Sequence, residues 1–108
     1  MASILISEPN AEVRALLELL VARLGHRPLR AEELAEGTEP ELILLEPASS
    51  AGVELAKRLR ARSAHLPIVC ASILPPGPEV DGIAPVTYLI KPVRLRELET
   101  AIAAALGS

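Results

Sequence analysis

The sequence has almost no aromatic side chains. Tyr88 is the only aromatic among 108 residues, and there is neither tryptophan nor phenylalanine. Half of the residues are nevertheless apolar, which is enough to fill one core in a chain of this length. We therefore expect a single domain, residues 1–108, whose core consists of leucine, isoleucine, valine and alanine. These residues suit the close packing of helices on a sheet.

The chain also lacks a positive excess, a cysteine pair and a long apolar run. Its 11 basic and 14 acidic residues are interspersed and give a net charge of −3, so no broad positive field favours nucleic acid or anionic lipid. Cys70 is the one cysteine and lies in an apolar run, which excludes an internal disulfide and predicts a small buried hydrophobe. No apolar run approaches the roughly 18 to 20 residues that span a bilayer, and the amino terminus lacks a signal-peptide pattern. We expect a cytoplasmic protein without nucleic-acid or membrane partners.

Apolar strands and amphipathic helices alternate along the chain. Short apolar runs predict strands at residues 3–7, 27–32, 42–45, 68–71 and 86–90. Helical spacing predicts one helix between the N-cap Asn10 and Gly25, one over residues 51–62, and a last one with apolar positions at Leu95, Leu98, Ile102 and Leu106. The first helix presents an apolar face of Val13, Leu16, Leu17, Leu20, Val21 and Leu24.

Two stretches do not support full helices. Residues 33–40 are few and rich in turn formers, which limits them to about one or two helical turns. Residues 75–85 contain four prolines and two glycines, which exclude a normal helix. The remaining alternation predicts an α/β domain with five parallel strands and helices on both faces, and the strand at 27–32 lies at an edge because Pro28 cannot donate a ladder hydrogen bond.

Four polar side chains follow or end the predicted strands: Glu8, Glu46, Ser72 and Lys91. In a doubly wound parallel sheet, ligands bind at the carboxyl ends of the strands, near the point where the strand order reverses. Two carboxylates, one hydroxyl and one ammonium from four separate strands therefore predict a pocket at that edge of the sheet.

The order of these motifs resembles the receiver domain of bacterial response regulators, the CheY-like superfamily, along nearly the whole chain. The resemblance rests on a strand followed by an acid, a helix ending in Leu-Gly, the run Leu-Ile-Leu-Leu before Glu46, and above all the Lys91-Pro92 pair after a strand. It implies a flavodoxin-like sheet of strand order 2-1-3-4-5, here with helix 2 short and helix 4 reduced or absent. It also implies a place in two-component signal transduction or a phosphorelay.

The resemblance implies a role for each matching position. Glu46 falls at the phospho-accepting aspartate, Glu8 and Pro9 at the acid pair that holds magnesium, Ser72 at the hydroxyl that senses the phosphoryl group, Lys91 at its lysine partner, and Tyr88 at the aromatic switch. The departures point to a degenerate form, or pseudo-receiver. Pro9 supplies no carboxylate, Glu46 is one methylene longer than aspartate and can pair with Lys91 permanently, and the loop between Glu46 and Gly52 is shorter than usual.

Each position also has an ordinary structural interpretation. The two glutamates can be solvated acids, Ser72 can satisfy nearby backbone groups, and Lys91 can end a strand where a proline begins the next helix. Tyr88 fits a core position as well as an interface. Neither His26 nor His65 has partners at metal-ligand spacing, and we expect both to be exposed.

Three functions remain open at this point. The first is a phosphorylation-independent receiver that binds a protein partner or an output domain, or pairs with a second copy of the chain. The second is a working phospho-acceptor, or a magnesium-dependent phosphate-handling protein, that uses Glu8 and Glu46, since Mg²⁺ keeps several waters and needs few carboxylates. The third is a small-molecule binding module. We expect no enzymatic activity, no catalytic residue, no metal ligand set and no cofactor beyond weak Mg²⁺ binding, because no nucleophile has a base beside it in the pattern.

Overall fold

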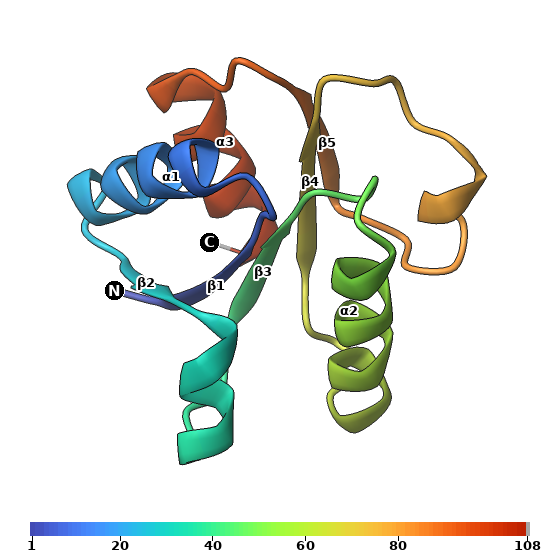
Figure 1. Ribbon diagram of the computed structural model, residues 1–108. Coiled ribbons are helices and arrows are strands. Elements are labelled where there is room, and N and C mark those ends of the chain that lie inside the picture. Colours follow the sequence, from blue (N-terminus) through green and yellow to red (C-terminus); the bar gives the residue numbers. More distant parts are fainter. Residues whose placement is uncertain (108) are drawn as a thin grey trace.

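Five parallel strands form the central sheet (Figure 1), and the computed structural model describes residues 1–107. The strands are β1 Ser3–Ser7, β2 Arg27–Leu29, β3 Leu42–Leu45, β4 Ile68–Ser72 and β5 Thr87–Ile90. They lie in the order β2-β1-β3-β4-β5, which confirms the strand order 2-1-3-4-5. All residues of β3 and β4 are buried, as expected for apolar strands that are covered on both faces.

Within the described residues, three α-helices and two short 3₁₀ segments connect the strands. The helices are α1 Ala11–Arg23, α2 Ser50–Arg62 and α3 Leu95–Ala105, and the 3₁₀ segments are η1 Ala31–Glu36 and η2 Pro78–Val80. The N-cap of α1 is confirmed, because the Asn10 side chain accepts hydrogen bonds from the Glu12 and Val13 amides. The short η1 and η2 also confirm that the second helix is short and the fourth is reduced.

The connecting elements cover both faces of the sheet, as Figure 1 shows. Successive β1 residues point to opposite faces, so Ile4 and Ile6 pack with α1 and α3 while Leu5 packs with α2. The segment between β4 and β5 lies on the α2 side and contributes the buried Ile83 to that core. Among residues 1–107, each helix is too short or too polar to cross a bilayer.

Leu16 does not belong to the core, which corrects the apolar face expected for α1. Its exposed fraction is 48%, and that of Leu19 is 66%, whereas Leu17 and Val21 are buried. The leucine stripe on α1 is wider than the area that the sheet and α3 cover. Helical spacing identified the buried side of α1 but not the limit of the contact.

Two further expectations are corrected, one just before β2 and one at its end. His26 is partly buried rather than exposed, because its Nδ1 accepts a hydrogen bond of 3.0 Å from the Ala2 amide, while His65 is exposed as expected. The edge strand ends at Leu29 instead of running to residue 32, because η1 begins at Ala31. The burial of His26 arises from a contact with the distant residue Ala2. The early end of β2 arises because the 3₁₀ turn η1 forms in place of further strand.

Gly52 lies in the first turn of α2, pressed against β1 and β3. A Cβ atom there would lie 2.8 Å from Ser7 Oγ and 2.9 Å from Leu45 Cδ1. We expect Gly52→Ala to lower the free energy of unfolding by about 1–2 kcal/mol, because overpacking costs about 1–3 kcal/mol and the helix propensity of alanine returns at most about 1 kcal/mol. Urea unfolding measures this change. Gly82→Ala is the control with unchanged stability, since its nearest neighbour would be Lys57 Cε at 3.5 Å. A Gly52→Ala protein as stable as the wild type would contradict this close contact.

Candidate functional site

The carboxyl ends of four strands bring the predicted polar side chains together. Glu8 follows β1, Glu46 follows β3, Ser72 ends β4 and Lys91 follows β5. The parallel register aligns these ends, with Ser7 beside Leu45 and Ser72 beside Ile90. The side chains of Glu8, Glu46 and Lys91 are 4%, 9% and 11% exposed, and Ser72 is fully buried. The side chains that the sequence predicted to converge therefore lie together at the carboxyl ends of the strands.

Lys91 bridges the two carboxylates. Its Nζ donates a hydrogen bond of 2.8 Å to Glu46 Oε1, and it also donates to Glu8 Oε1. A buried ammonium with two buried carboxylates forms a charge-assisted network in which each charge has a partner. We call these three residues the Glu8–Lys91–Glu46 triad.

A repeated local motif holds the outer oxygen of each carboxylate. Each glutamate is followed by a proline, and the amide two residues after the glutamate donates back to its side chain. The Asn10 amide reaches Glu8 Oε2 at 3.1 Å, and the Ala48 amide reaches Glu46 Oε2 at 3.0 Å. Sequence reasoning missed these backbone donors, although the repeated Glu-Pro pair is a signal for two matching turns. Each of the four carboxylate oxygens thus accepts a hydrogen bond.

The charges of Glu46 and Lys91 are held by hydrogen bonds against the effect of burial. Burial acts to raise the pKa of Glu46, but hydrogen bonds from Lys91 and the Ala48 amide outweigh it, and the pKa lies below its ordinary value of 4.5. Burial acts to lower the pKa of Lys91, but its hydrogen bonds to Glu46 and Glu8 outweigh it, and the pKa lies above 10.5. Glu46 and Lys91 are therefore both charged at neutral pH.

Ser72 and Tyr88 tie the segment after β4 to the site. The Leu74 amide donates to Ser72 Oγ at 3.3 Å, and the Tyr88 hydroxyl donates to the Leu74 carbonyl at 2.7 Å. The Ser72 hydroxyl also helps to lower the pKa of Glu46 by hydrogen bonding. Burial raises the pKa of the Cys70 thiol to about 12, with the charges of Glu46 and Glu79 acting in the same direction. Cys70 is thus a buried, protonated thiol, as the sequence indicated.

The side chains present do not fit a magnesium site of the kind that the receiver resemblance implies. Pro9 is exposed and supplies no carboxylate, and both available carboxylates already bind the Lys91 ammonium. Mg²⁺ requires an octahedral shell of oxygen ligands and waters, and a cationic group at the same oxygens competes with it. Among residues 1–107 there is no cluster of three or more histidine, cysteine or acidic side chains arranged to hold a metal ion.

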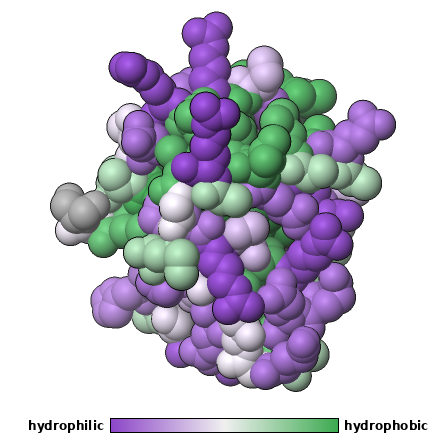
Figure 2. Space-filling view, turned by 90° about the vertical axis from the view of Figure 1, so that its left-hand side faces the viewer, coloured by the Kyte–Doolittle hydropathy of each residue, from purple (hydrophilic) through white to green (hydrophobic). Residues whose placement is uncertain are grey.

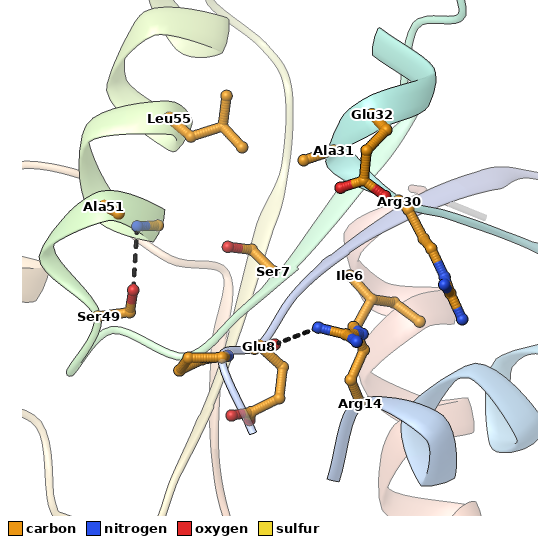
Figure 3. Close-up of a pocket in the computed structure, with 12 residues that line it drawn as sticks. Ile6, Ser7, Glu8, Arg14, Arg30, Ala31, Glu32, Ser49, Ala51 and Leu55 are labelled. Carbon is orange, nitrogen blue, oxygen red and sulfur yellow. Dashed lines mark hydrogen bonds between the residues drawn. The ribbon is translucent and has the colours of Figure 1, made fainter. Parts of the chain in front are cut away.

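An open pocket of about 330 Å³ lies beside Glu8 (Figure 3). The start of α2 lines one side with Ser49, Ala51 and Leu55, and Arg14 of α1 lies on the other. Arg14 Nη1 donates to the Glu8 carbonyl at 3.4 Å, which joins α1 to the end of β1. Nothing in the sequence pattern singled out this contact, because it depends on the angle at which α1 crosses the sheet.

Comparisons with known proteins agree on the fold. No protein-family model and no curated protein sequence matches the chain. Solved structures do match, and they include a response regulator receiver domain, a signal receiver domain and a CheY chemotaxis protein. The chain therefore has the architecture of a receiver domain of two-component systems, which confirms the predicted fold.

Three of these solved structures indicate the range of neighbours. Chemotaxis protein CheY4 of Vibrio cholerae superposes with a TM-score of 0.83 at 18% identity, over 98% of this chain and 99% of that chain. The signal receiver domain of a modulated diguanylate cyclase from Desulfovibrio desulfuricans G20 gives 0.82 at 26% identity, over 98% and 94%. NtrX from Brucella abortus gives 0.82 at 20% identity, over 97% of this chain but only 26% of that longer chain.

Proposed function

We propose that this chain is a pseudo-receiver, a receiver domain that works without phosphorylation and transmits its signal by binding a protein partner or an output domain. The observation that carries the proposal is the Glu8–Lys91–Glu46 triad. Phosphoryl transfer to a carboxylate requires a free oxygen in line with the donor and a cation that neutralises the phosphoryl oxygens. At Glu46, each carboxylate oxygen already accepts a hydrogen bond, from Lys91 or from the Ala48 amide, and the ammonium competes with a divalent cation for the same carboxylate.

The expected result with a small phosphodonor is no reaction. Intact-mass spectrometry of the protein after incubation with acetyl phosphate and magnesium chloride is expected to show the unmodified mass only. Glu46→Gln is the matched control, because it removes the only carboxylate at the acceptor position. A phosphoryl adduct on the wild type that is missing from Glu46→Gln would overturn the proposal and support the working phospho-acceptor.

Calorimetric titration with magnesium chloride is expected to show no submillimolar binding.

Partner binding is supported by the neighbours and by the surface. The diguanylate cyclase structure is the signal receiver domain of a larger protein, and this chain matches only 26% of the NtrX chain, which favours a partner or an output domain for this chain too. Figure 2 shows the α1 side of the molecule, where apolar surface gathers between charged side chains, and the exposed leucines of α1 are Leu16 and Leu19. Exposed apolar clusters mark interaction sites. The proposal includes a cytoplasmic location and no enzymatic reaction, nucleic acid or membrane.

A further inference from the structure

A groove separates α2 from the segment that follows β4. It has a volume of about 470 Å³, and its apolar lining includes Pro47, Val53, Leu74 and Pro78. The segment between β4 and β5 forms only the three residues of η2, because its prolines and glycines prevent a longer helix. Figure 1 shows this segment arching away from the sheet on the side of α2. The groove therefore lies where the reduced helix leaves the side of α2 uncovered.

The rim of the groove is acidic. Glu54 of α2 and Glu79 of η2 line it from opposite sides, both are exposed, and neither forms an ion pair with any residue in the range 1–107. The one base in the lining is Lys57, whose side chain lies against Gly82. The groove carries a net negative charge.

Exposed apolar side chains stand at one end of this acidic rim. Ile73 is 73% exposed and Leu74 is 55% exposed, and they are consecutive residues at the start of the segment. The backbone beneath them is fixed, since Tyr88 binds the Leu74 carbonyl and Ser72 binds the Leu74 amide. Two adjacent large apolar groups held rigidly in water suit an interface, where little conformational entropy is lost on binding.

We propose that this groove binds a basic peptide segment of a partner protein, with an apolar side chain against Leu74 and arginine or lysine side chains facing Glu54 and Glu79. The inference rests on the proposed function, because it specifies the chemistry of the partner that a pseudo-receiver would bind. Opposite charges around an apolar anchor give both attraction at a distance and a defined register. Nucleic acid and anionic membranes are disfavoured by the same negative charge.

The test selects short random peptides displayed on phage against the full chain at low ionic strength. We expect the enriched peptides to combine arginine or lysine with a leucine, isoleucine, methionine or aromatic residue. A fluorescein-labelled copy of an enriched peptide then measures affinity by anisotropy. The variant Glu54→Lys/Glu79→Lys is expected to weaken binding about tenfold, since attraction is replaced by repulsion at an exposed rim. Glu36→Lys/Glu99→Lys reverses two exposed acids outside the groove and is the matched control; it is expected to leave the affinity within about twofold of the wild type.

Three results would overturn this inference. They are the absence of any enriched peptide, enrichment of acidic or uncharged peptides, and binding that Glu54→Lys/Glu79→Lys weakens no more than Glu36→Lys/Glu99→Lys does. Circular dichroism of the three proteins establishes that the variants are folded. The phosphodonor experiment is independent of these outcomes. If the phosphodonor leaves the mass unmodified and no basic peptide is enriched, the proposed peptide binding is wrong and the pseudo-receiver proposal stands. If an acyl phosphate forms, the pseudo-receiver proposal is wrong, whichever peptides are enriched.

Discussion

Replacing Lys91 by methionine is expected to lower the free energy of unfolding by about 3–5 kcal/mol, the cost of removing one partner from a buried ion pair. The substitution keeps the volume of the side chain but leaves Glu8 and Glu46 buried, a few ångströms apart, without the ammonium between them. Each carboxylate keeps one backbone amide donor, from Asn10 or Ala48, which does not replace a full charge. Urea unfolding at neutral pH measures the change.

The matched control removes all three charges at once. The variant Glu8→Gln/Glu46→Gln/Lys91→Met is expected to recover most of the lost stability. Its free energy of unfolding is expected to lie within about 1–2 kcal/mol of that of the wild type, because neutral amides have a much smaller desolvation penalty than buried charges. If Lys91→Met alone costs less than about 1 kcal/mol, the triad does not hold the strand ends together in solution. If the triple variant is as unstable as Lys91→Met, packing rather than charge explains the loss.

The stability of the protein is expected to fall at both ends of the pH scale through the same triad. The pKa of Glu46 in the folded state lies below 4.5, so its contribution is present above pH 4.5 and is lost as the pH falls through the folded value. The pKa of Lys91 in the folded state lies above 10.5, so its contribution is present below pH 10.5 and is lost as the pH rises through the folded value. Between these limits the triad contributes a constant amount.

The measurement compares urea unfolding of the wild type and of the triple variant from acidic to strongly alkaline pH. Other titrating groups are common to both proteins, so the difference between the two curves isolates the triad. We expect the difference in free energy of unfolding to be constant around neutral pH. At each end of the pH range the wild type is expected to lose stability relative to the triple variant. A difference that stays constant below pH 4 and above pH 11, about half a unit beyond the ordinary values, would show that the triad is not charged as the geometry indicates.

The sequence predicted the fold correctly because its local signals agree with one another. The apolar runs at 42–45 and 68–71 can only be buried strands, Asn10 caps the helix that follows β1, and the prolines between β4 and β5 exclude a helix. The elements that were misjudged lie at the edge. β2 is shorter than expected, and Leu16 is exposed, because the extent of an edge contact depends on what packs against it.

The sequence also predicted which side chains meet. The carboxyl ends of parallel strands all lie at the same end of the sheet, so residues placed directly after the strands converge there. It predicted the pair of Glu46 with Lys91, which the structure confirms, but not the rest of the arrangement. That Lys91 binds Glu8 as well as Glu46, and that the Asn10 and Ala48 amides take the outer oxygens, depends on distances of a few ångströms between separate strands.

The sequence by itself therefore determined the number and type of the elements, the end of the sheet that carries polar groups, and the absence of a carboxylate at Pro9. These follow from periodicity, backbone chemistry and residue identity, which are local properties. Only the tertiary structure decided that the polar groups form a closed charge network, that Leu16 and Leu19 remain in water, and that an acidic groove lies beside α2. Those features depend on the packing angles and spacing of elements far apart in the chain, and local residue patterns do not encode them.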